Sequence, residues 1–192
     1  MTARTEGIEE LALPDMERRT ANAIRYGTVM AVDLANARVR VKSGEIETTW
    51  LPWSTGRASP AKRRWDPPAV GEQVIMLSPG GDMRQGVVLP GIFQDSAAAP
   101  SASADADTTV YSDGTMIEYD RAAGALSVTF SGGGQLRMIA TEAKFTFGGC
   151  TAVITSAGID VTGGDVTADG ISLKTHVHTG VIPGGANTGG PA

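Results

Sequence analysis

The chain has 192 residues, which is room for one or two small domains with modest hydrophobic cores. It holds 25 glycines and only 5% aromatic residues, a composition that favours short strands and tight turns over a helical bundle. The net charge of −5 argues against a general nucleic-acid binder, and a single cysteine, Cys150, fits a protein made in a reducing cytoplasm. Residues 1–15 lack the apolar stretch of a signal peptide, and no apolar run approaches the roughly 20 residues of a membrane-spanning helix.

Residues 1–24 are expected to form an N-terminal helical segment. The helix itself is predicted over residues 14–24, because Pro14 suits a first helical turn. Asp15 and Glu17 then lie at the positive end of the helix dipole. A helix this short is not stable alone, so it should dock on something else.

Residues 25–95 change to a period of two, which is typical of β-strands. Val29, Val32 and Leu34 mark a first strand, and in a second strand hydrophobic residues alternate with basic ones through residues 37–42. Asn36 lies between the two runs as the turn of a hairpin. Further strands are predicted at 46–51, 73–77 and 85–89. Five short antiparallel strands are what a small OB-fold barrel needs, with residues 53–71 as a long insertion.

Residues 96–107 are rich in Ala, Ser and Asp and are interpreted as a linker, because they bury too little apolar surface to order themselves. From residue 108 to 174 the strands become shorter and glycines mark the turns; Leu126, Val128 and Phe130, for example, share one face. One chain of such strands would have exposed edges and little core. Three chains wound together would remove the edges and bury one apolar face along the axis. We therefore expect an intertwined trimeric rod that tapers towards its C-terminal end.

Residues 175–192 are predicted to form a tip, and they hold both histidines of the chain, His176 and His178. Side chains two apart in a strand point the same way. Two imidazoles make a poor metal site, but three copies round a threefold axis would bring six to one octahedral ion. Strict alternation from Ile171 and Leu173 puts the histidines on the other face, so an inward pair needs a bulge or bend before His176. The competing interpretation is a pair of solvated tail residues.

Several short motifs follow one another in a specific order across nearly the whole chain. They are Glu17-Arg18-Arg19 followed by Gly27, Trp50-Leu51-Pro52-Trp53, Val70-Gly71-Glu72-Gln73-Val74, Pro79-Gly80-Gly81-Asp82, Val88-Leu89-Pro90-Gly91-Ile92, Asp113-Gly114-Thr115-Met116-Ile117-Glu118-Tyr119 and the His-Val-His tail. This order resembles the P2-type baseplate assembly protein V family. Those proteins are the central spikes of contractile-tailed phages and of related phage-tail-like bacteriocins.

The resemblance implies a homotrimer with an N-terminal OB domain attached to the baseplate hub and tail proteins. It further implies a triple-stranded β-helix and a tip that holds one iron ion per trimer through six histidines, His176 and His178 of each chain; another axial ion is left open. Such a spike belongs to the tail baseplate of the virion and is assembled in the cytoplasm of the bacterial host. It acts at the host envelope, where it pierces the outer membrane when the sheath contracts.

One alternative function is nucleic-acid binding by the OB domain. Basic and aromatic residues gather in the insertion: Arg57, Lys62, Arg63, Arg64 and Trp65. OB folds often bind single strands through stacking and charge. The same loop equally suits solvent or an acidic partner in the hub, and the chain is acidic overall, so no nucleic-acid partner is expected.

A cell-wall hydrolase is a weaker alternative. Asp113, Glu118 and Asp120 are close in sequence, but they lie in a turn and strand with no sign of the burial that would make one an acid and another a base. A nucleophilic site would have to recruit His176 or His178, far along the chain from any pocket-forming region. The sequence therefore predicts a protein that is not an enzyme.

Overall fold

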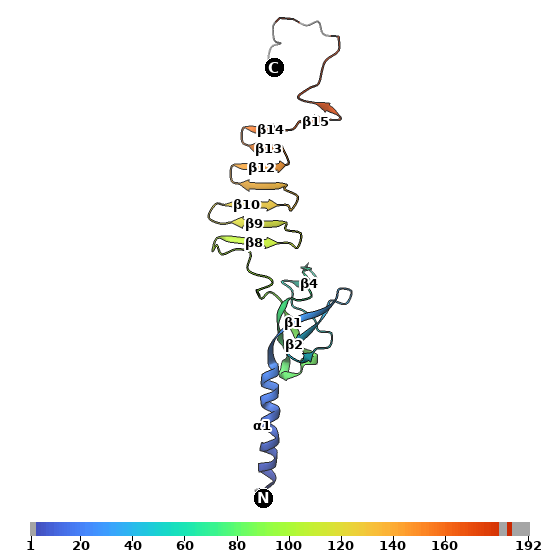
Figure 1. Ribbon diagram of the computed structural model, residues 1–192, viewed down its shortest axis with the longest axis vertical. Helices are drawn as coiled ribbons and strands as arrows, with labels where there is room; N and C mark the ends of the chain where they lie inside the picture. The colour runs from blue at the N-terminus through green and yellow to red at the C-terminus, as the bar shows by residue number, and fades with distance from the viewer. Residues whose placement is uncertain (1–2, 181–183, 186–192) are drawn as a thin grey trace. The chain divides into compact units, whose positions relative to one another are not determined.

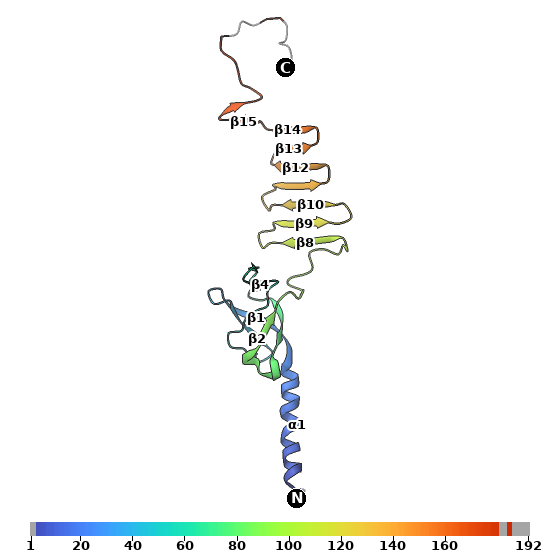
Figure 2. The ribbon, with the colours of Figure 1, turned by 180° about the vertical axis from the view of Figure 1, so that it is seen from behind.

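The structure, a computed structural model, describes residues 3–180 and 184–185, with side chains from residue 13 onward. It divides into two compact units, Met1–Ala99 and Pro100–Ala192. Among the described residues, the regular elements apart from one α-helix and two short 3-10 turns are all β-strands, as predicted (Figures 1 and 2). No helix within the described ranges combines the length and the apolar character needed to cross a membrane.

Helix α1 (Ala3–Ala23) is longer than predicted, since it begins at Ala3 and carries Pro14 in its interior. Residues 3–13 are rich in Ala, Leu and Glu, which are good helix formers. Their preference outweighs the one backbone hydrogen bond that a proline cannot donate. The helix also ends early, because Ile24 already belongs to the first strand. The prediction of a helix over residues 14–24 is therefore wrong at both ends.

The first unit contains a five-stranded antiparallel sheet in the order β3-β2-β1-β6-β7. Its strands are β1 (Ile24–Asp33), β2 (Arg38–Ser43), β3 (Ile46–Glu47), β6 (Gln73–Leu77) and β7 (Val87–Leu89). The segment after β3 closes this sheet into a barrel, because Leu51 bridges to Val39 of β2 and Trp53 bridges to Val88 of β7, the opposite edge. The buried core inside consists of Val29, Val39, Val41, Leu51, Val74, Met76 and Val88.

Two predicted strands of the barrel are shorter in the structure. The one expected at 46–51 is regular only in β3 and returns as a single bridge at Leu51. The one expected at 85–89 is confined to β7, since η2 (Met83–Gln85) takes up its first residue. The long insertion carries a small hairpin of β4 (Ala58–Ser59) and β5 (Lys62–Arg63).

Helix α1 contacts the barrel at η1 (Pro79–Gly81), which contains two glycines with different surroundings. Both have positive φ angles, 60° at Gly80 and 73° at Gly81. A Cβ on Gly81 would overlap the backbone of Arg19 in the helix, whereas a Cβ on Gly80 would meet nothing within 4 Å. Gly81 is thus the point of closest approach between helix and barrel.

Replacing Gly81 with Ala should destabilise the barrel more than the same change at Gly80. Gly80→Ala is expected to cost about 1–2 kcal/mol from the left-handed backbone alone. Gly81→Ala adds the displacement of the helix, about 1–3 kcal/mol more. Denaturant unfolding followed by tryptophan fluorescence measures this unit selectively, because all three tryptophans lie within residues 50–65. Equal losses in the two variants would contradict the close approach.

The second unit is a seven-stranded meander in which each strand pairs antiparallel with its neighbours in sequence, from β8 to β14 (Figure 1). The strands are β8 (Ala106–Val110), β9 (Met116–Asp120), β10 (Ala125–Thr129), β11 (Gln135–Ile139), β12 (Glu142–Phe147), β13 (Cys150–Thr155) and β14 (Gly158–Thr162). Within the single chain, the ladder hydrogen bonds run between consecutive strands. The reason is that the short turns leave sequence neighbours side by side. Strand β8 also takes the last two residues of the predicted linker 96–107.

Beyond the meander lies a hairpin of only two residues in each strand, β15 (Thr167–Ala168) and β16 (Ile171–Ser172). Its turn residues Asp169 and Gly170 have φ angles of 50° and 82°, as the tightest hairpin turns require. Only this last hairpin shows the predicted shortening towards the C-terminal end, since strands β8 to β14 all have five or six residues. Of the predicted tip 175–192, residues 181–183 and 186–192 lie outside the described residues.

Candidate functional site

One face of the β8–β14 meander is apolar from β9 to β14. Residues paired across neighbouring strands lie on the same face, so the register defines rows that cross the sheet. The first row is Ile117, Val128, Leu136, Phe145, Ala152 and Val161, and the second is Tyr119, Leu126, Met138, Ala143, Ile154 and Ile159. The opposite face carries the charged residues, among them Glu118, Arg137, Lys144 and Asp160.

Much of this apolar face is open to solvent in the single chain. Tyr119 is 46% exposed, Phe147 58% and Ile159 70%. A contiguous exposed apolar surface marks an interaction site in a water-soluble protein, because each large side chain gains about 1.5–3 kcal/mol on burial. Strands β8 and β14 also leave unpaired edges. The meander is therefore built to be covered by another surface.

The two histidines follow a turn at residues 173–175, directly after β16. The bend predicted between Leu173 and His176 is thus present. The rings of His176 and His178 lie edge to face, with centroids 5.2 Å apart and planes at 81°. Both side chains are exposed. The structure therefore brings the two predicted site residues together.

A contact with the backbone determines which nitrogen of the His176 ring donates a hydrogen bond. Its Nδ1 lies 2.8 Å from the carbonyl oxygen of Ser172. A carbonyl oxygen only accepts, so Nδ1 is the donor in this contact, and in the neutral ring this tautomer leaves the lone pair on Nε2. A neutral imidazole with a backbone partner on one nitrogen is the usual form of a metal-binding histidine. One chain brings two imidazole rings, and no cluster of three or more potential ligands forms among the side chains that the structure describes.

The sequence analysis missed the residues that shape this turn, Asp165 and Ser172. The Ser172 hydroxyl donates to Asp165, and this bond is the main cause that lowers the pKa of the Asp165 carboxyl below its ordinary value. A Ser or Asp beside a turn is a known signal for such local bonds. That signal does not reveal that two residues seven positions apart share one bond.

The carboxylates considered for catalysis do not form an acid–base pair. Asp113 accepts hydrogen bonds from the backbone N–H and the hydroxyl of Thr115, both at 2.9 Å. These bonds lower the pKa of Asp113, which is the opposite of what a general acid needs. Glu118 is bonded to the Thr108 hydroxyl at 2.9 Å. The bonds of Asp113 belong to the turn before β9, and the bond of Glu118 belongs to the pairing of β8 with β9.

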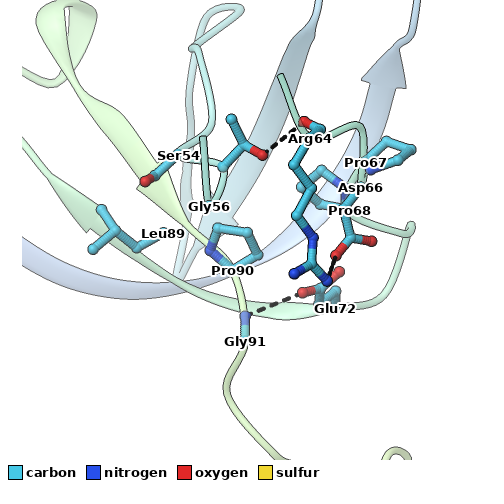
Figure 3. A pocket seen from close by; sticks show the side chains of 11 residues that line it. Ser54, Gly56, Arg64, Asp66, Pro67, Pro68, Glu72, Leu89, Pro90 and Gly91 are labelled. Atoms are coloured by element: carbon cyan, nitrogen blue, oxygen red, sulfur yellow. Dashed lines mark hydrogen bonds and ion pairs between the residues drawn. The ribbon is translucent and has the colours of Figure 1, made fainter. Parts of the chain in front are cut away.

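The basic loop of the insertion borders an open pocket of about 400 Å³ in the first unit (Figure 3). Arg64 points into it but is paired with Asp66 at 3.3 Å, and Glu72 lines the same pocket. Two carboxylates against one guanidinium leave the pocket negative, which disfavours a phosphate backbone. The ring of Trp65 lies against that of Trp53, with centroids 5.7 Å apart, and so part of its surface is occupied.

Comparison with known proteins agrees with both units. Residues 25–93 match the family described as the type VI secretion system/phage-baseplate injector OB domain, and residues 170–192 match the GpV apex motif. The fold and the two matches define an injector protein of the baseplate class. The chain is 34% identical over 207 aligned positions to the spike protein of Escherichia phage P2, with 93% of this chain and 97% of the relative covered. The chain belongs to the family of phage-baseplate spike proteins.

Proposed function

We propose that this protein is the central spike of a phage-tail or tailocin baseplate, a structural trimer whose tip pierces the bacterial outer membrane when the sheath contracts. Family membership gives the structural spike role. The observation that carries the mechanism is the apolar face of the meander, which is too exposed for a chain that acts alone. A piercing point needs a stiff, narrow body, and covered apolar faces supply that stiffness.

Three copies suit the site better than two. Two meanders stacked face to face would also cover their apolar surfaces, but they would bring only four imidazoles together. Three copies supply six, which fill the shell of one octahedral ion. The strands of the three chains would then enclose an apolar axis, with the charged face outside.

The apex is proposed to hold one iron ion per trimer, bound by His176 and His178 of each chain. The paired rings and the free Nε2 of His176 support this, since imidazole nitrogen suits iron and its neighbours in the transition series. A bound ion would tie three chain ends together at a point where the strands are only two residues long. With six protein ligands no position is open to a substrate, so the role is structural and no catalysis is proposed.

The OB domain is proposed to attach the spike to the baseplate hub and tail proteins of the virion. The protein would be assembled in the host cytoplasm and act at the host envelope. The match of residues 25–93 to an injector OB domain supports this role over nucleic-acid binding. The paired Arg64 and the acidic pocket beside it point the same way.

The mass of the purified full-length chain tests the trimer. Light scattering is expected to give about three times the chain mass of 19.8 kDa. The mass should stay constant on dilution until the protein also unfolds, because covering the apolar face and association are one event. A stable, folded monomer or dimer would contradict the proposal.

A further inference from the structure

A small network of hydrogen bonds around Ser172 shapes the turn that carries the histidines. Its hydroxyl oxygen accepts from the backbone N–H of Lys174 at 3.1 Å and of Thr175 at 2.8 Å. The Thr175 hydroxyl lies 2.8 Å from the same oxygen. Its carbonyl oxygen accepts from the backbone N–H of His176 at 3.1 Å and from the ring Nδ1 at 2.8 Å. One half-buried residue thus holds both the turn and the ring.

Asp165 connects this network to the residues before the hairpin. Its Oδ1 accepts from the backbone N–H of Lys174 at 3.3 Å and of Val166 at 2.8 Å. The backbone N–H of Lys174 is thus shared between the Ser172 hydroxyl oxygen and Asp165, which links the turn to the residues before the hairpin. Asp165, which lies before the hairpin, therefore helps to set the orientation of the turn.

We propose that Ser172 is a positioning residue of the apex, which holds His176 as the Nδ1–H form so that Nε2 is presented to a transition-metal ion. This inference rests on the apex ion of the proposed function. A ring that turns freely, or that carries its proton on Nε2, must be reordered before it can bind, and that reordering weakens binding. Because the ring of His178 lies against that of His176, fixing the first ring also restricts the second.

Ser172→Ala tests the inference, since it removes the hydroxyl that closes the turn and leaves the histidines in place. The full-length trimer should bind iron(II), titrated anaerobically against a competing chelator, about 10–100-fold more weakly than the unchanged protein. Ser172→Thr keeps the hydroxyl and should restore most of the affinity. Asp165→Asn should weaken binding in the same direction by a smaller factor.

The tautomer gives a readout that does not depend on metal. With only two histidines in the chain, ¹⁵N-labelled imidazoles can be assigned with one His178→Ala variant. In the metal-free protein the His176 signals should show the proton on Nδ1, and in Ser172→Ala they should move towards a mixture of the two forms. A loss of general stability alone would not produce that shift.

Ser156→Ala is the matched control, because Ser156 lies in the exposed turn between β13 and β14 and has the same side chain. It should change neither affinity nor tautomer. Unchanged iron affinity and unchanged ring signals in Ser172→Ala would overturn the inference and leave the apex ion standing. An unmodified trimer that takes up no iron would overturn the apex ion itself, and this inference with it.

Discussion

Replacing Leu126 with Asp is expected to abolish the trimer and the folded second unit. Leu126 lies in the middle of an apolar row, between Tyr119 and Met138 on the neighbouring strands. If three chains cover this face, the substitution places three carboxylates beside one another without water or partners. The cost per chain is on the order of several kcal/mol or more, comparable with the whole stability of a small domain. Light scattering should show loss of the trimeric mass, and circular dichroism loss of the cooperative β-sheet transition.

Ser127→Asp is the control for this experiment, since Ser127 is the next residue of the same strand and faces Glu118 and Arg137 on the charged side. It should leave the trimer intact. Tryptophan fluorescence should show the barrel still folded in both variants, because its core lies in the other unit. A Leu126→Asp protein that remains a stable trimer would show that the apolar face is not the interface.

Replacing either His176 or His178 with Ala should remove the metal and leave the trimer. Each change takes three of six ligands from the proposed shell, so iron is expected to fall from about one ion per trimer to almost none. The mass should not change, because the apolar face remains covered. Elemental analysis of protein purified without chelator measures the first effect and light scattering the second.

Thr179→Ala is a suitable control, since Thr179 is exposed and adjacent to the pair but has no imidazole. Its iron content should equal that of the unmodified protein. A well-folded trimer without any transition metal, or a His176→Ala protein that retains it, would refute the site.

Alternation of side chains made most of the barrel predictable. Strand β2 shows this, because Val39 and Val41 alternate with basic residues and are buried. Strand β6 has the predicted bounds, 73–77, for another reason, since its short apolar run is bounded by turn residues. The start of α1 was not predictable from Pro14, which is favoured in a first turn but tolerated where strong helix formers precede it. Strand ends were also missed where Leu51 and Trp53 are held by single bridges to distant strands.

In the second unit the apolar face was predictable from sequence, but its pairing was not. Alternation tells which residues share a face and is the same whether the neighbouring strand comes from this chain or another. At the apex, the spacing of His176 and His178 and the need for a bend were predictable. The protonation pattern of His176 was not, since it depends on a carbonyl four residues earlier that only the folded turn brings near.

The strictly sequential pairing of β8 to β14 makes the length of the spike adjustable in units of one hairpin. Removing or inserting two strands restores the direction of the chain and keeps the alternation of apolar and charged faces in step. Each such step changes the stack by about 10 Å, twice the spacing between paired strands. A lineage could thus change the length of the meander by duplicating or deleting one hairpin, with the barrel and the apex untouched. Spikes of graded length could be engineered from this one sequence in the same way, by adding or removing hairpins.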